Sequence, residues 1–222
     1  MKTKLLLGAA ATLLASGGAF AQAAGSFIVH AGGAQVSPDV ESTDLTAPSF
    51  VGTRFDVKKA SAFVGGVTYF TGDHLSFDLS VAAPFKHDVV GAGAIAGTGR
   101  LATVKSQPIS LLAQYRFGDA GSALRPFVGA GVTYHHLSRT KATAALSGIS
   151  GGSASMPTTL AMKSRLGPMV EVGAAYNVTR DWSASLSVGK TLLKTTGTLS
   201  TGQTFETSLA PVTIKFAIGY RF

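Results

Sequence analysis

Few side chains in this 222-residue chain have types and spacing that could support catalysis. His136 and Ser138 are two residues apart, so on a β-strand they share one face, and a histidine can activate a serine to attack an ester. Such a pair also needs an acid that orients the histidine. Glu171 falls on the opposite strand face in the phase described below. Acyl hydrolysis therefore stays only as an alternative.

Metal, thiol and nucleotide chemistry have less support. The chain has no cysteine, which excludes thiol catalysis, cysteine-ligated metals and a lipid-modified cysteine. His87 beside Asp88 could begin a metal or acid–base site, but no second ligand has suitable spacing. A rim histidine bonded to a loop or to Asp88 is therefore favoured. Gly129-x-Gly131 lies inside an expected strand with no helix after it, unlike a nucleotide fingerprint. We expect no catalytic residue, metal or cofactor.

The N-terminus has the composition of an export signal. Lys2 and Lys4 precede a short apolar stretch, and Ala19-Phe20-Ala21 has the small-x-small pattern of a cleavage site. Gly17-Gly18 breaks the stretch before it could span a bilayer as a helix. We expect residues 1–21 to be a signal peptide, with a slightly later cleavage site as the alternative, and residues 22–222 to form one domain.

The chain is basic, with a formal net charge of +8. An exported chain does not normally meet nucleic acid, and Lys58-Lys59 is too short a run to recognise it. We therefore expect no nucleic-acid partner. Anionic lipid headgroups at the cell surface are the expected counterpart of the positive charge.

Large and small residues alternate along the C-terminal segment. From Val212 to Phe222 every even position is large and apolar or aromatic, and every odd position is small or charged. A period of two predicts a strand with one apolar face. The same alternation recurs in 75–82, 109–117, 128–134, 166–177 and 182–189. Less regular strands are expected at about 26–37 and 57–70, which gives eight.

The composition of the second face separates a membrane barrel from a soluble sandwich. A sandwich would carry many charges on that face, but here it is mostly Ser, Gly, Thr and Ala. Small residues fit the crowded interior of a narrow barrel, while the large ones face lipid. Isolated charges could pair inside; these are Asp78, Arg116, Arg165, Glu171, Lys215 and Arg221.

Long and short connections alternate between the expected strands. The short ones carry turn residues near 71–73, 118–121 and 179–181. Aromatic residues gather near these turns and the C-terminus: Tyr69, Tyr115, Phe117, Tyr176, Trp182, Tyr220 and Phe222. Tight periplasmic turns, long extracellular loops and an aromatic girdle are typical of outer membrane proteins. The sequence predicts an all-β fold, an eight-stranded antiparallel transmembrane β-barrel in the bacterial outer membrane.

Several segments resemble the OmpW family. Pro84-Phe85-Lys86-His87 is similar to its Pro-Phe-x-His segment, and Gln107–Phe117 ends in its Gln-Tyr-x-Phe pattern. Arg125–Tyr134 and Gly219-Tyr220-Arg221-Phe222 also fit, so the resemblance covers essentially the whole expected barrel. Ser106-Gln107-Pro108 lacks the family's second proline, and the third long loop has no match.

This resemblance implies a narrow, largely apolar channel for passive uptake of small hydrophobic molecules. In the family, with its AlkL-like branch, solutes are thought to enter from outside and to leave sideways into the membrane. Pro84 and Pro108 fall on neighbouring strands and each removes a ladder donor, which makes them candidates for a lateral exit. The alternative is that these prolines only end strand pairing near the barrel rim.

Strand phase predicts which apolar side chains line the channel: Val64, Leu112, Phe127 and Met169. The expected partners are small hydrophobic solutes, outer membrane lipids with lipopolysaccharide, and the barrel-assembly machinery, which would read the C-terminal Phe222. Two other functions remain open on the same fold: a structural or adhesive surface barrel with a plugged lumen, and the lipid-modifying acyl hydrolase.

Overall fold

The computed structural model describes residues 25–47, 49–138, 140–153 and 155–222. The predicted signal peptide, residues 1–21, lies outside these ranges. Eight of the ten strands in the main sheet of the described chain form the barrel: β1 (Phe27–Ser37), β4 (Ala60–Phe70), β5 (Leu75–Ala82), β7 (Arg100–Arg116), β8 (Leu124–Ser138), β11 (Arg165–Asn177), β12 (Trp182–Thr191) and β15 (Val212–Arg221).

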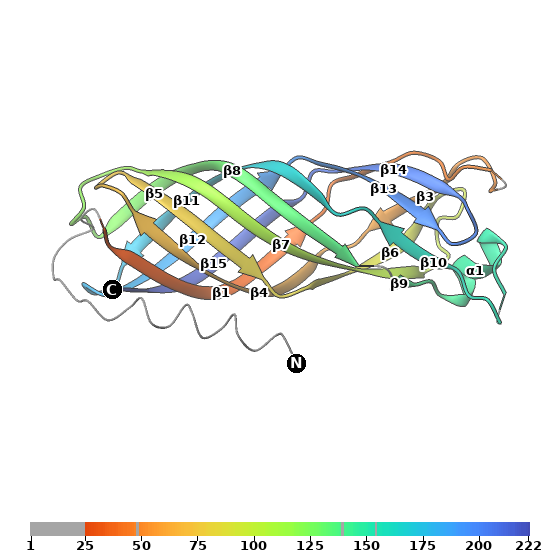
Figure 1. The fold of residues 1–222 in the computed structure, drawn as a ribbon, viewed down its shortest axis with the longest axis horizontal. Coiled ribbons are helices and arrows are strands. Elements are labelled where there is room, and N and C mark those ends of the chain that lie inside the picture. The colour runs from red at the N-terminus through yellow and green to blue at the C-terminus, as the bar shows by residue number, and fades with distance from the viewer. Residues whose placement is uncertain (1–24, 48, 139, 154) are drawn as a thin grey trace.

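These eight strands close into an antiparallel barrel. Each strand pairs with the next one along the chain, and β1 pairs with β15 from Ile28↔Arg221 to Ser37↔Val212. Closure leaves no open strand edge around the ring, which is the condition for backbone amides to lie in lipid. The predicted fold class is therefore confirmed, and Figure 1 shows the barrel with its long axis horizontal.

The long connections fold into further strands rather than loops. β3 (Thr53–Val57) pairs with β6 (Phe85–Gly93), which continues beside β7. A second sheet contains β2 (Val40–Ser42), β9 (Thr140–Lys141), β10 (Thr159–Met162), β13 (Leu193–Leu199) and β14 (Thr204–Leu209). With helix α1 (Ala144–Ser150), these elements extend the barrel at the end opposite the C-terminus, as Figure 1 shows.

The alternation in the sequence corresponds to the two faces of the wall. In β5 the residues Leu75, Phe77 and Leu79 are exposed, while Ser76 and Asp78 between them are buried in the interior. The same holds around the ring, where large apolar side chains such as Leu111, Val172 and Phe216 remain half exposed. A band of exposed hydrocarbon around a polar interior is the surface that lipid requires.

Aromatic pairs gather at the short-turn end of the barrel. Phe27 lies 4.7 Å from Tyr69, and Trp182 lies 5.0 Å from Tyr220, measured between ring centroids. Tyr220 in turn lies 4.9 Å from Phe222. These rings form the girdle expected at one membrane–water interface. The one helix in the described part of the chain is too short to cross a bilayer.

Candidate interior passage and lateral seam

A cluster of ionised side chains crosses the middle of the barrel. Lys215 on β15 lies 3.0 Å from Glu171 on β11 and 3.9 Å from Asp78 on β5. The side chains of both acids are almost fully buried, at 1% and 3% exposure. Asp78 also bonds to His30 Nε2 at 2.7 Å and accepts a hydrogen bond from Thr68 Oγ1 at 2.9 Å. We call Asp78, Glu171 and Lys215, together with the His30 ring that bonds to Asp78, the central charged cluster; His30 counts here as a hydrogen-bonding partner and not as a charge.

Polar side chains extend this cluster toward the short-turn end. Gln114 Nε2 donates to Glu171 at 3.1 Å, and Arg116 donates to Gln114 Oε1 at 3.0 Å. The Arg116 guanidinium lies 5.0 Å from the ring centroids of both Phe70 and Phe127. A cavity of only about 30 Å³ remains among these groups. Hydrogen-bonded side chains thus fill the half of the interior nearer the short turns, as expected for a barrel of eight strands.

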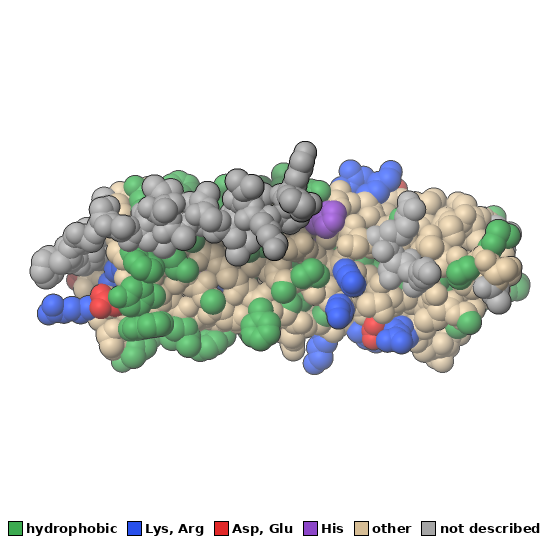
Figure 2. All heavy atoms as spheres, turned by 60° about the horizontal axis from the view of Figure 1, so that its bottom comes forward, with side chains coloured by type: hydrophobic (Ala, Val, Ile, Leu, Met, Phe, Trp, Pro, Cys, Tyr) green, Lys and Arg blue, Asp and Glu red, His purple; other side chains and the backbone are tan. Residues whose placement is uncertain are grey.

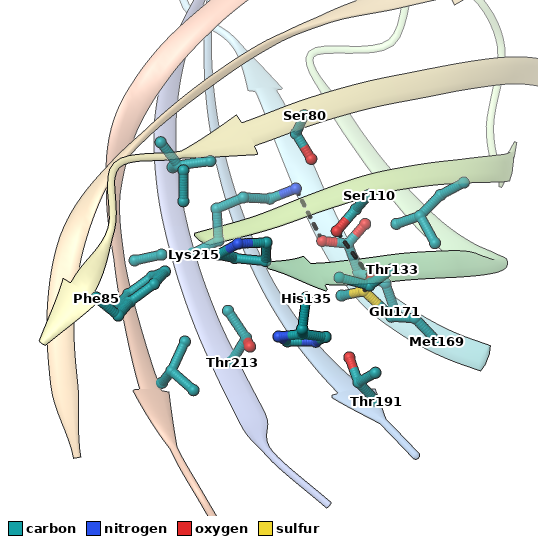
Figure 3. Close-up of a pocket in the computed structure, with 16 residues that line it drawn as sticks. Ser80, Phe85, Ser110, Thr133, His135, Met169, Glu171, Thr191, Thr213 and Lys215 are labelled. Atoms are coloured by element: carbon teal, nitrogen blue, oxygen red, sulfur yellow. Dashed lines mark hydrogen bonds and ion pairs between the residues drawn. The ribbon is translucent and has the colours of Figure 1, made fainter. Parts of the chain in front are cut away.

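A second cavity, which we call the upper cavity, lies on the long-loop side of the central charged cluster. Its volume is about 50 Å³, enough for a few water molecules. Figure 3 shows Met169, Thr133, His135 and Phe85 around it, together with Lys215 and Glu171, whose ion pair is drawn as a dashed line. Most of its surface is apolar, with Val64 and Leu112 among the lining side chains.

The structure brings three of the four predicted channel-lining residues together. Val64, Leu112 and Met169 are all buried and line the upper cavity. Phe127 is buried too, but it lies below the central charged cluster, against Arg116 and the smaller cavity. Strand phase alone gives the side of the wall on which a residue lies, not its height along the barrel.

Pro84 and Pro108 lie at an irregularity in the wall. The β5–β7 ladder ends at Val81↔Ile109, and the β6–β7 ladder begins at Phe85↔Ser106. Three residues, 82–84, therefore face two residues, 107–108, which is a β-bulge. In the described chain no register pair joins these two stretches. We call this interruption the lateral seam.

Pairing resumes beyond the two prolines instead of ending there. Pro84 is exposed between β5 and β6, and Pro108 is half buried inside β7, where it lines the upper cavity. The alternative that they only end pairing at a rim does not describe this wall, because β6 and β7 continue past them. The bulge also reverses the strand phase, so Ala82 and Phe85 both point inward.

Phe85 and His135 are cavity residues that the sequence analysis did not select. Phe85 was missed because the phase of β5 places it on the outside, and only the bulge at Ala83–Pro84 turns it inward. A proline inside an alternating segment is the available signal for such a shift. His135 alternates inward with Thr133, and its neighbour His136 was considered only as a catalytic residue.

Apolar side chains close the interior on the long-loop side. One buried apolar cluster is shared by strands β3 and β7 of the main sheet and by the second sheet. Its members include Phe55, Leu101, Leu160 and Phe205. Leu146 of α1 is fully buried against the same cluster. Gln203 donates to the carbonyl oxygen of Ser150 at 3.1 Å and ties the helix to the β13–β14 connection. The interior is thus apolar at the long-loop end and charged at its middle.

The groups considered for catalysis are not assembled. His136 and Ser138 are on the outer face of β8, where their register partners on β7 are Gln107 and Lys105. Glu171, in contrast, is buried in the interior and accepts a hydrogen bond from Ser187 Oγ at 2.7 Å. In the described chain no carboxylate bonds to the His136 ring. An acyl hydrolase would need such an acid.

The remaining polar candidates have structural contacts. His87 Nδ1 bonds to the backbone oxygen of Lys58 at 2.9 Å, the loop contact that the sequence favoured. No group of three or more potential metal ligands occurs among the described residues. Arg221 bonds to Asn177 Oδ1 at 3.3 Å, but Arg165 is exposed at the start of β11, so its expected interior pairing is wrong.

Comparison with known proteins agrees with this architecture. The sequence profile of the OmpW family matches residues 23–222. Outer membrane protein W of Escherichia coli K12 is 35% identical over 226 residues, which cover 100% of both chains. The crystal structure of OprG from Pseudomonas aeruginosa superimposes with a TM-score of 0.80 at 26% identity, over 91% of this chain and 99% of that one.

The fold of AlkL, determined in lipid bilayers, is also similar. Its TM-score is 0.63 at 20% identity, over 93% of this chain and 94% of that chain. The similar proteins are named outer membrane proteins, and the apolar band and closed ring fit that location. The chain is an outer membrane β-barrel and belongs to the OmpW family.

Proposed function

We propose that this barrel is a passive conduit that takes small hydrophobic molecules from outside the cell and releases them sideways into the membrane. One observation carries the proposal: the largely apolar upper cavity is bounded below by the central charged cluster and reaches the lateral seam through Pro108, Ala82 and Phe85. A solute in this cavity meets buried charges along the axis and an interrupted ladder at the side.

The apolar cluster at the extracellular end is the entry route in this proposal. Its leucine and phenylalanine side chains offer a hydrophobic solute contacts similar to those in lipid. The cavity of about 50 Å³ is smaller than such a solute, so entry requires side chains such as Met169 and Phe85 to move aside. Val64 and Leu112 then form the apolar wall that the solute contacts.

Uptake by whole cells that express the protein tests the proposal. The probe is a hydrophobic naphthylamine dye that fluoresces after it enters lipid. Since the chain has no cysteine, the pair Ala83→Cys and Gln107→Cys can be joined across the lateral seam by a short bifunctional thiol reagent. We expect the joined seam to abolish the added uptake. Unchanged uptake after complete crosslinking would refute the lateral exit.

A matched control uses the same two strands where the ladder is intact. Phe77 and Ala113 are register partners on the outer face of β5 and β7. Crosslinking Phe77→Cys to Ala113→Cys should leave dye uptake as in the uncrosslinked protein. If both crosslinks stop uptake equally, the effect comes from stiffening the wall and not from closing an exit.

A structural surface barrel is the second candidate, and the closed interior favours it. Hydrogen-bonded side chains pack the described interior, and the two cavities among them have volumes of only about 50 and 30 Å³. In that case cells with the barrel take up no more dye than cells without it. The same assay therefore separates the two functions.

A further inference from the structure

A group of basic side chains lies on the outer surface where the apolar band ends. Along β7 the outward positions run from Leu111 and Ile109, both about half exposed, through Gln107 to Lys105. Figure 2 shows Lys and Arg side chains gathered in a band across the middle of the molecule, between the hydrophobic surface and a surface of mainly other polar side chains. This level corresponds to the lipid headgroups at the extracellular side.

Two of these lysines stand directly opposite each other. Lys86 on β6 and Lys105 on β7 are register partners, and both side chains are exposed. Partners in an antiparallel ladder have Cβ atoms about 5 Å apart, so two like charges there repel each other. An anion bound between the two ammonium groups would remove this repulsion.

Two further basic groups surround this pair. Lys58 N–H donates to the Asp88 carbonyl oxygen at 2.9 Å, so the exposed Lys59 that follows lies beside the Lys86–His87 segment. His136 is exposed on β8 and is diagonal to Lys105, whose register partner is Ser138. We call Lys59, Lys86, Lys105 and His136 the outer basic patch.

The nearby carboxylates are engaged with other bases. Asp56 lies 2.8 Å from Lys58, and Asp88 lies 3.8 Å from Arg100 and accepts a hydrogen bond from Thr103. In the described ranges no carboxylate is within ion-pair distance of Lys59, Lys86 or Lys105. The positive charge of the patch is therefore not compensated within the described chain.

The opposite end of the barrel has a different charge pattern. Its short turns carry Asp73, Asp119 and Asp181 together with Arg180, and no cross-strand pair of lysines occurs there among the described residues. A patch of this kind therefore occurs at only one of the two membrane boundaries of the described barrel. An outer membrane has phosphorylated glycolipid in its outer leaflet only, so its phosphate-rich side matches the side on which the patch lies.

We propose that the outer basic patch is a binding site for the phosphate groups of lipid A, the membrane anchor of lipopolysaccharide. One phosphate lies between Lys86 and Lys105 and removes their repulsion, and Lys59 and His136 contact the surrounding polar headgroup. The acyl chains of the lipid lie along the apolar surface formed by Ile109 and Tyr134. Charge-assisted hydrogen bonds from ammonium groups to phosphate provide the specificity.

Binding to the purified full barrel in a nonionic detergent tests this site. The probes are bisphosphorylated lipid A, the same lipid after removal of its phosphates, and inorganic phosphate. We expect tight binding of the first probe only. Each of Lys86→Gln and Lys105→Gln should weaken it about fivefold at low salt, and the double variant about 30-fold. Added salt should reduce the difference.

Arg180→Gln is the matched control, since it removes one positive charge from an exposed position at the periplasmic end. It should bind lipid A as the unmodified protein does. The proposal is overturned if the double variant keeps full affinity, if Arg180→Gln weakens binding as much as Lys105→Gln does, or if dephosphorylated lipid A binds equally well. Equal retention of inorganic phosphate would instead identify a site for free anions and would also overturn it.

Discussion

Replacement of Lys215 by methionine should destabilise the barrel strongly while leaving its hydrophobic surface unchanged. Lys215 has 13% side-chain exposure and lies between two buried carboxylates, Glu171 at 3.0 Å and Asp78 at 3.9 Å. Removing one partner of a buried ion pair costs about 3–5 kcal/mol, because the other charge stays buried without compensation. Glu171 still accepts hydrogen bonds from Ser187 at 2.7 Å and Gln114 at 3.1 Å. These donors place the expected loss near the lower end, about 3 kcal/mol.

Urea unfolding in detergent micelles, followed by the mobility difference between folded and unfolded barrel on gels, measures this loss. The double variant Glu171→Gln with Lys215→Met removes one negative charge with the positive one, so it should recover most of the stability. Lys190→Met, an exposed lysine on β12, should change the unfolding free energy by less than about 0.5 kcal/mol. The reasoning is refuted if Lys215→Met unfolds at the same urea concentration as the unmodified protein, or if the double variant is the less stable one.

Three further outcomes test the barrel wall, the upper cavity and the membrane depth. A Cβ atom on Gly32 would lie 1.9 Å from a backbone oxygen of β15, so Gly32→Ala should lower the free energy of unfolding by about 1–3 kcal/mol in the same urea assay. A Cβ atom on Gly33 would have nothing within 4 Å, so Gly33→Ala should leave the free energy of unfolding unchanged. Val64→Trp fills the upper cavity and should slow dye uptake severalfold, while Val67→Trp on the outward face of the same strand should not. Trp182, the only tryptophan of the chain, should be quenched more by lipids brominated near the headgroup than by lipids brominated at the chain ends.

The barrel strands could be predicted because lipid and interior impose opposite demands on neighbouring residues. In β5 each large residue contacts lipid and each small or polar one faces the interior, so the pattern is strong over eight residues. The same reasoning places Asp78 and Glu171 inside, where burial requires a partner. Their common partner, Lys215, also follows from phase, but the specific pairing depends on strand register, which phase does not give.

The extension strands could not be recognised because both of their faces are built from similar residue types. In β13 the buried positions include Thr195 and the outward ones Thr196 and Thr198, so the alternation has little contrast. This segment lies beyond the apolar band, where water allows a polar outer face. Helix α1 falls within the third long loop, and its seven residues are too few to show a helical period.

The two possible exits from the upper cavity differ in energetic cost. A path along the axis must separate Lys215 from Glu171 and Asp78, which costs about 3–5 kcal/mol and exposes the solute to buried charges. A path through the lateral seam has fewer bonds to break, because Pro84 and Pro108 have no N–H to donate and each ordinary ladder bond contributes about 1 kcal/mol. In the proposed function, a hydrophobic solute therefore meets the lower barrier sideways, where lipid receives it directly. It follows that the crosslink between residues 83 and 107 should stop uptake without reducing stability, whereas Lys215→Met should reduce stability and leave the seam able to release the solute. Release toward the periplasm that persists after complete crosslinking of the seam would show that the axial path, and not the seam, is the route.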